Sequence, residues 1–259
     1  MKKYSVFMLL LLVLITGTVQ AGLVAYYPFN GNANDESGNG NNGTSYGATQ
    51  TTDRFGNANS AYSFDGSGDY IDVPNAPSLN PTDAITITAW FKADSFALGS
   101  YSWPNIVRKS DNDGTKGYTM EIQWVYENRP SLWGAVYLKD QGWLMPIEPF
   151  QLPVAEDTWY FAASVFDGLT LTNYLRSMDQ TSFTTAQING SGNIVPSSNN
   201  LWIGNAPIYG DRSFDGIIDD VRIYNRALTT DEVIEVYSIP EPVTILLLTL
   251  GGIILRRKR

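Results

Sequence analysis

The sequence predicts an all-β protein, a sandwich of two antiparallel sheets, flanked by a short apolar segment at each end. Apolar and polar residues alternate with a period of two in many short runs. Gly, Asn, Asp and Pro break these runs at intervals of roughly 8 to 12 residues. Hydrophobic residues make up 43% of the 259 residues and charged residues 17%, with 23 Gly and 15 Tyr. This composition is typical of a turn-rich globular domain and not of a disordered chain.

The N-terminal segment, residues 1–21, has the three parts of a secretory signal peptide. Lys2 and Lys3 precede an apolar run from Val6 to Ile15, and a small residue, Ala21, closes a cleavage site of the A-x-A type. We therefore expect an exported protein.

Residues 22–238 are expected to form one domain, because no linker divides them. The clearest strand is Ala84–Phe91, in which Ile85 and Ile87 face one way and Thr86 and Thr88 the other. Further strands are expected near Val24–Phe29, Ala61–Phe64, Tyr118–Tyr126, Ser131–Leu138, Trp159–Phe166, Leu171–Leu175, Asn200–Gly204 and Ile217–Tyr224. One short helix is expected where Thr229 and Glu232 form a capping-box pattern.

The C-terminal segment, residues 239–259, contains an apolar run that is short for a membrane span. Val243–Leu255 would extend about 20 Å as a helix, against a hydrocarbon core of about 30 Å. The basic residues Arg256 to Arg259 follow directly and would stay in the cytoplasm. A plain C-terminal membrane anchor is one interpretation.

A second interpretation rests on the residues before the apolar run. Pro240, Glu241 and Pro242, a short apolar helix and an Arg-rich end that includes Arg256 and Arg257 together resemble the PEP-CTERM sorting signal. The resemblance implies recognition by the membrane enzyme exosortase and only a transient membrane anchor. It places the processed protein in the cell envelope or outside the cell.

The composition also limits the chemistry. The chain has no His and no Cys, which excludes disulfides, zinc-thiolate sites and an imidazole base, so that any metal would be a hard cation bound by oxygen atoms. The net charge of −9 argues against nucleic acid as a partner.

Four motifs resemble the LamG-like, concanavalin A-like jelly-roll domains. They are LVAYYPFNGNANDESGNGNNGT at Leu23–Thr44, YSFDGSGDYIDV at Tyr62–Val73, ITITAWFKAD at Ile85–Asp94 and FDGIIDDVRIYNRALTTDEV at Phe214–Val233. The resemblance implies two curved antiparallel sheets, with the first and last segments side by side.

The segment from Asn30 to Gly43 is rich in Asn, Asp and Gly. By itself it fits an Asx-rich surface loop or a calcium loop equally well. The resemblance favours a structural calcium ion between this loop and the last strand. It implies Asp35, Asn39 and Asp219 as ligands, and we expect Asp219 on the inward face of its strand.

Aromatic residues are concentrated between Tyr101 and Trp143, where Asp111–Gly114 is predicted to be a turn. Most of these rings are expected to pack within the fold. Trp103 and Trp143, next to Pro104 and Gly142 in loop-like contexts, are the best candidates for an exposed surface on which a sugar ring could stack.

Three functions are compatible with these features. The first is a noncatalytic surface module that binds exopolysaccharide glycan or a surface protein, and the second is a structural component of the extracellular matrix without a specific ligand. The third is a polysaccharide-degrading enzyme, which is disfavoured because the E-x-D-x-E run of such enzymes is absent. We therefore expect a protein that is not an enzyme.

Overall fold

The computed structural model describes residues 20–96, 103–125, 129–146, 152–209 and 212–239. The larger of two compact units spans Gln20–Leu228, and Thr229–Arg259 belongs to the smaller one together with Met1–Val19. Most of the predicted signal peptide, residues 1–19, and of the predicted sorting signal, residues 240–259, lies outside the described residues.

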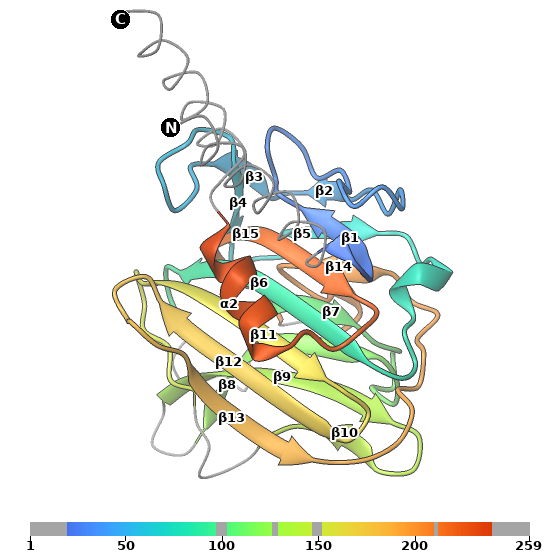
Figure 1. The fold of residues 1–259 in the computed structure, drawn as a ribbon. Helices are drawn as coiled ribbons and strands as arrows, with labels where there is room; N and C mark the ends of the chain where they lie inside the picture. Colours follow the sequence, from blue (N-terminus) through green and yellow to red (C-terminus); the bar gives the residue numbers. More distant parts are fainter. Residues whose placement is uncertain (1–19, 97–102, 126–128, 147–151, 210–211, 240–259) are drawn as a thin grey trace, which may run out of the picture. The chain divides into compact units, whose positions relative to one another are not determined.

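Two antiparallel sheets build the larger unit, and the predicted fold class is confirmed (Figure 1). One sheet has eight strands in the order β13-β12-β11-β6-β15-β4-β3, with β1 paired to β15, and the other has seven in the order β10-β9-β8-β7-β14-β5-β2. The strands are β1 Leu23–Tyr27, β2 Thr44–Tyr46, β3 Thr49–Thr51, β4 Ala61–Asp65, β5 Tyr70–Val73, β6 Ile85–Ala93, β7 Asn105–Lys109, β8 Tyr118–Val125, β9 Arg129–Leu138, β10 Gly142–Leu144, β11 Trp159–Phe166, β12 Thr170–Ser177, β13 Thr184–Asn189, β14 Leu201–Ile203 and β15 Asp215–Tyr224. The 3-10 turns η1 Pro77–Leu79 and η3 Pro207–Tyr209 interrupt the connections between strands in the described residues.

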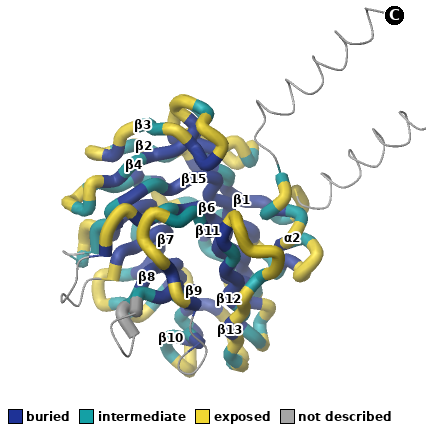
Figure 2. The backbone as a smooth tube through the Cα atoms, turned by 90° about the vertical axis from the view of Figure 1, so that its left-hand side faces the viewer, coloured by how far each residue is buried: buried dark blue, intermediate teal, exposed yellow. Residues whose placement is uncertain are grey.

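The core lies between the sheets, where alternate residues of facing strands meet. Ile85, Ile87 and Phe91 of β6 belong to it, as their alternation predicts, and so do Met120 and Ile122 of β8. Most buried segments lie in strands and most exposed segments in the connecting loops (Figure 2), but the outer strands β2, β3 and β13 are largely exposed or partly exposed. β1 and β15 pair directly, which confirms the expected contact between the first and last segments of the domain.

Strand β15 contains an irregularity that changes which way Asp219 points. The register with β6 shifts between Asp219 and Arg222, and Asp220 has a positive φ of 52°. Asp219 is the cross-strand partner of Trp90, whereas Ile218, one residue earlier, belongs to the core. The expectation that Asp219 faces the core was therefore wrong, because a bulge interrupts the alternation.

Strand β7 was not predicted, because its charged residues do not fit an apolar-polar alternation. Arg108 and Lys109 are both buried in it. The Lys109 ammonium group donates to the Asn75 side chain at 2.7 Å and to the Ser197 carbonyl at 2.9 Å. Burial lowers the pKa of Lys109 to about 8.

The predicted helix exists as α2, Thr230–Ser238, in the smaller unit. The Thr229 hydroxyl accepts from the Glu232 backbone N–H at 3.3 Å, and the Glu232 carboxylate accepts from the Thr229 backbone N–H at 2.8 Å. This is the capping box that the sequence predicted. In the described part of the chain, no helix has both the length and the apolar character needed to cross a membrane.

Candidate functional site

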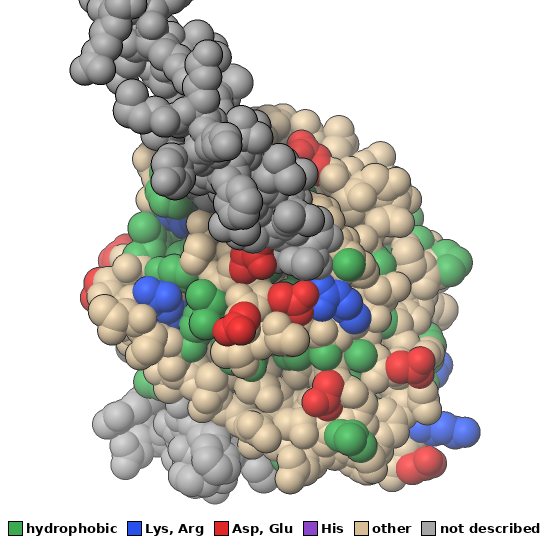
Figure 3. All heavy atoms as spheres, in the orientation of Figure 1, with side chains coloured by type: hydrophobic (Ala, Val, Ile, Leu, Met, Phe, Trp, Pro, Cys, Tyr) green, Lys and Arg blue, Asp and Glu red, His purple; other side chains and the backbone are tan. Residues whose placement is uncertain are grey.

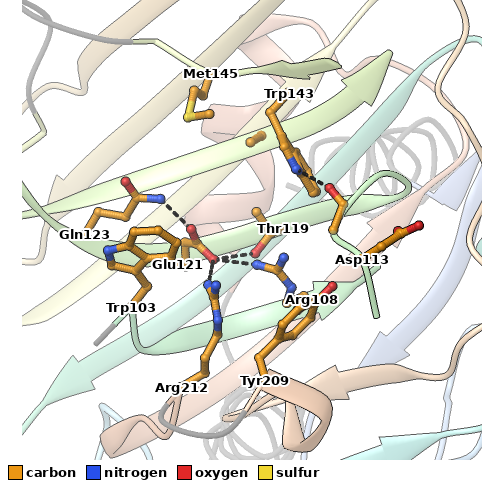
Figure 4. A pocket seen from close by; sticks show the side chains of 12 residues that line it. Trp103, Arg108, Asp113, Thr119, Glu121, Gln123, Trp143, Met145, Tyr209 and Arg212 are labelled. Carbon is orange, nitrogen blue, oxygen red and sulfur yellow. Dashed lines mark hydrogen bonds and ion pairs between the residues drawn. The ribbon is translucent and has the colours of Figure 1, made fainter. Parts of the chain in front are cut away.

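A pocket of about 380 Å³ lies on the outer face of the seven-stranded sheet. Because Met120 and Ile122 of β8 point into the core, the alternate residues Glu121 and Gln123 point to the opposite face. We call this cavity the Glu121 pocket. Its chemistry is carried by six lining residues: Trp103, Arg108, Glu121, Trp143, Tyr209 and Arg212 (Figure 4).

The sheet register brings these side chains together from distant parts of the sequence. Arg108 of β7 is the cross-strand partner of Thr119 on β8, and Trp143 of β10 is the partner of Tyr137 on β9. Trp103 lies two residues before β7, Tyr209 ends η3, and Arg212 lies in the loop before β15. Residues outside the sheet therefore complete a surface that begins on β7, β8 and β10.

Glu121 is the centre of a dense hydrogen-bond network. Its Oε2 atom accepts from Arg108 Nη1 at 2.9 Å, Asn105 Nδ2 at 2.9 Å, Thr119 Oγ1 at 3.1 Å and Arg212 Nη1 at 3.4 Å. Its other oxygen accepts from the Gln123 amide. The carboxylate is 4% exposed and pairs with both guanidinium groups, so that it holds them in fixed positions.

The two arginines also stack on the aromatic rings of the pocket. The Arg108 guanidinium carbon lies 4.5 Å from the ring centroid of Tyr209 and 5.6 Å from that of Trp143. The Arg212 guanidinium carbon lies 4.6 Å from the centroid of Trp103 and 5.0 Å from that of Tyr209. These cation-π contacts orient the rings and the charges together.

The surroundings of Arg212 lower its pKa. Burial lowers the pKa of Arg212, and the nearby Arg108 charge lowers it further, against the opposing effect of Glu121. The charged form of Arg212 is thus incompletely solvated where it stands.

Trp103 and Trp143, the two tryptophans singled out in the sequence, line the same pocket. Trp103 is 36% exposed. Trp143 lies in strand β10 and not in a loop, and its Nε1 donates to the Gly114 carbonyl at 2.6 Å. Gly114 closes the predicted turn, in which its N–H donates to the Asp111 carbonyl at 3.0 Å. The structure thus brings both tryptophans to one site, while their role in ligand binding stays a prediction.

Comparison with known proteins identifies the family. The model of the concanavalin A-like lectin/glucanase superfamily, of the laminin G type, matches residues 65–234. The chain belongs to this superfamily. No curated protein matches the chain in sequence.

Solved structures share the concanavalin A-like fold at low sequence identity. Domain 4 of AbnA, an extracellular arabinanase from Geobacillus stearothermophilus, in complex with arabinotriose, has a TM-score of 0.61 and 18% identity over 83% of this chain and 97% of that one. The binding domain of Paraclostridial Mosquitocidal Protein 1 has a TM-score of 0.60 and 15% identity, over 83% of this chain. The ligand-binding domain of botulinum neurotoxin serotype D, in complex with N-acetylneuraminic acid, has a TM-score of 0.54 and 13% identity, over 86% of this chain. The chain spans about half the length of the two toxin domains.

The three residues expected to bind calcium in this concanavalin A-like domain have other partners. Asp35 accepts hydrogen bonds from the backbone N–H groups of Tyr26 and Asn41, each at 2.9 Å. The Asn39 amide donates to the Leu23 carbonyl at 3.1 Å. Both residues therefore brace the loop that follows β1.

Asp219 pairs with a guanidinium group instead. Its Oδ2 atom lies 2.6 Å from Arg54 Nη1, and Arg54 Nη2 lies 3.0 Å from Asp220 Oδ2. Among the residues that the structure describes, no group of three or more Asp, Glu, His or Cys could hold a metal ion. Arg54 already offsets the charge of Asp219, so that these donors fit a shared cation poorly.

Arg108, Glu121, Tyr209 and Arg212 were not predicted as site residues. A signal for Glu121 exists in the sequence, since Thr119, Glu121 and Gln123 alternate with apolar residues and mark a polar row on an otherwise buried strand. Arg212 carries no such signal, because its approach to Glu121 depends on the path of a loop.

Proposed function

We propose that this chain is an exported, noncatalytic cell-surface or extracellular-matrix protein whose concanavalin A-like domain binds glycan in the Glu121 pocket. The observation that carries this proposal is the pocket itself, where the aromatic residues Trp103, Trp143 and Tyr209 surround a fixed set of polar groups. Sugar-binding sites combine apolar stacking surfaces with a few oriented hydrogen-bonding groups. The complex of AbnA domain 4 with arabinotriose supports the proposal from a related fold.

The proposal that the domain is noncatalytic rests on the hydrogen bonds and ion pairs of the Glu121 carboxylate. Glycosidases generally use two carboxyl groups, of which one must be free to exchange a proton or attack the sugar. Both oxygens of Glu121 accept hydrogen bonds, and two arginines pair with it. A carboxylate held in this way serves to position its neighbours.

A glycan array with the purified full-length protein tests the binding function. We expect defined hits that are lost in Trp103→Ala and weakened in Trp143→Ala, because each change removes a ring from the pocket. Trp159→Ala is the matched control, since it removes an indole from β11 of the other sheet.

Two outcomes would contradict the proposal. If the array shows no hit, the second candidate, a structural matrix component without a specific ligand, takes its place. Release of reducing sugar from any bound polysaccharide would instead make the protein an enzyme.

The two ends of the chain support the proposed localisation outside the cell. The signal-peptide pattern in residues 1–21 and the Pro240-Glu241-Pro242 motif with its basic end support export, transient anchoring by the C-terminal helix and processing by exosortase. The glycan of the proposed site would then be extracellular, such as an exopolysaccharide or a surface glycan.

A structural calcium ion at Asp35, Asn39 and Asp219 stays a prediction. Thermal melting with calcium and with a chelator decides it. A higher melting temperature in calcium supports the ion, and equal melting temperatures leave Arg54 as the group that balances Asp219.

A further inference from the structure

We infer that the Glu121 pocket selects acidic sugars and holds the carboxylate of a uronic acid residue on Arg212 and Arg108. This inference rests on the proposed glycan binding and adds the class of glycan. Three observations support this inference. They are the N–H groups of Arg108 and Arg212 that make no hydrogen bond within the described part of the chain, the position of the Arg212 charge in the pocket, and the neighbouring indole ring of Trp103.

The two arginines have more N–H groups than the protein uses. Among the described residues, Arg212 donates only through Nη1, to Glu121. Arg108 donates through Nε to Ser110 at 2.7 Å and through Nη1 to Glu121 at 2.9 Å. The remaining guanidinium nitrogens of Arg108 and Arg212 make no hydrogen bond with the described residues and are not fully buried, and both side chains line the pocket. A ligand oxygen can therefore reach them.

One of the two positive charges of the pocket, that of Arg212, lies at the end near Trp103. Arg108 and Arg212 share a single carboxylate, Glu121. Figure 4 shows Arg212 beside Trp103, while Asp113 lies on the far side of Arg108, near Trp143. Asp113 accepts from the backbone N–H of Thr115 at 3.0 Å, so its own turn orients it. Arg108, Arg212 and Glu121 together therefore carry a net charge of +1, and Arg212 holds one of the two positive charges beside Trp103.

An anion at the end near Trp103 would stabilise the charged form of Arg212. Burial and the Arg108 charge lower the pKa of Arg212, which means that its charged form is poorly solvated. A carboxylate placed against the free edge of Arg212 supplies both the missing acceptors and the missing charge.

A uronic acid fits the combination of groups better than a neutral sugar. The planar guanidinium fork matches the two oxygens of a carboxylate. The carboxylate of a uronic acid is attached directly to the sugar ring, so that the ring can lie on the exposed part of Trp103 while the carboxylate contacts Arg212. A neutral sugar would leave the free N–H groups without a charged acceptor.

The net charge of the protein opposes this ligand only at long range. The chain carries −9, but at physiological ionic strength charges are screened beyond about 8 Å. Selection is thus made by contacts in the pocket, and short oligosaccharides are better probes than long polyanions.

Calorimetric titration with matched oligosaccharides tests the inference on the full-length protein, kept in mild detergent because of its apolar ends. The probes are tetramers of galacturonate, glucuronate, guluronate and mannuronate, each paired with its carboxyl-reduced, neutral counterpart. We expect at least one acidic tetramer to bind about tenfold or more tightly than its neutral partner. Arg212→Gln should remove this difference, and Arg212→Lys should restore part of it, because Lys keeps the charge without the fork.

The control is Arg176→Gln, which removes a guanidinium group from β12 of the other sheet, where it lies over Phe183. Unchanged melting temperatures of the variants show that a lost preference is not due to unfolding. Equal binding of acidic and neutral tetramers overturns the inference but leaves glycan binding intact. Absence of binding by every sugar, on the titration and on the array, overturns the proposed function itself.

Discussion

Arg54 shows how one side chain can connect distant parts of this fold. Its guanidinium group bridges Asp219 and Asp220, and it lies 4.4 Å from the ring centroid of Trp90 and 4.5 Å from that of Phe55. The Arg54 side chain is 1% exposed and that of Asp219 is not exposed at all. Carboxylates buried to this extent need a counter-charge, and Arg54 provides it.

Replacement of Arg54 by methionine is therefore expected to destabilise the domain by about 3–5 kcal/mol, because it leaves buried carboxylates without this partner. Chemical denaturation measures the change. The matched control is Lys92→Met, which breaks the more exposed pair with Asp94 and should cost at most about 1 kcal/mol. Adding Asp219→Asn to Arg54→Met should recover part of the loss, and equal losses for Arg54→Met and Lys92→Met would contradict the assigned role.

At the scale of elements, the close approach of the two sheets depends on a glycine in β9. The Asn173 amide of β12 donates to the Gly134 carbonyl at 3.0 Å. A Cβ atom at Gly134 would overlap the Ser164 hydroxyl of β11 and the side-chain oxygen of Asn173. The space between β9 and the other sheet therefore allows no side chain at this position.

We expect Gly134→Ala to destabilise the domain by about 1–3 kcal/mol, as is usual for overpacking in a close-packed interior. The unfolding free energies of Gly134→Ala, Ser164→Ala and the double variant Gly134→Ala/Ser164→Ala measure this loss. The double variant should lose less than the sum of the two single changes, because it removes one of the overlapping atoms. Additive losses would show that Ser164 does not limit the space at Gly134.

At the scale of the whole molecule, the face of the eight-stranded sheet can be compared with the Glu121 pocket on the other sheet. Figure 3 shows, on the side of the eight-stranded sheet, acidic and basic side chains scattered over a mainly uncharged surface. Of the positive groups of the Glu121 pocket, Arg108 stands on β7 of the other sheet, and Arg212 lies in the loop before β15. A small ligand with one charge suits this arrangement better than nucleic acid, which needs an extended basic surface.

The proposed processing makes a prediction about the mature chain. If exosortase acts on this protein, its mature form in the native host should lack Arg256 to Arg259, because removal of the C-terminal segment separates the domain from its basic end. Intact-mass spectrometry of the protein from the host measures this. Persistence of these four residues would make the segment a plain anchor.

The elements that the sequence predicted well are those whose signal is local. The alternation in Ala84–Phe91 and the capping box of Thr229 and Glu232 depend only on neighbouring residues, and both were confirmed. Strand β7 was missed because its buried Lys109 is satisfied by residues such as Ser197, far away in the chain. The direction of Asp219 was wrong because a bulge cannot be read from alternation.

The candidate site also combines residues that have a local signal in the sequence with residues that have none. The loop-like contexts of Trp103 and Trp143 pointed to these two rings, but nothing local connects them with Arg212. Their meeting depends on the antiparallel pairing of β7 to β10 and on the loop before β15. Glu121 acquires its role only where these segments converge.

The sequence by itself determined the all-β fold class, because periodic alternation reports on local backbone preference and on burial. Its motifs also resemble the superfamily whose model matches the chain. The tertiary structure decided which face Asp219 occupies, which charges are paired and where a pocket exists. These features arise from long-range strand register and from a bulge, which bring together side chains that are separated by many residues in the chain.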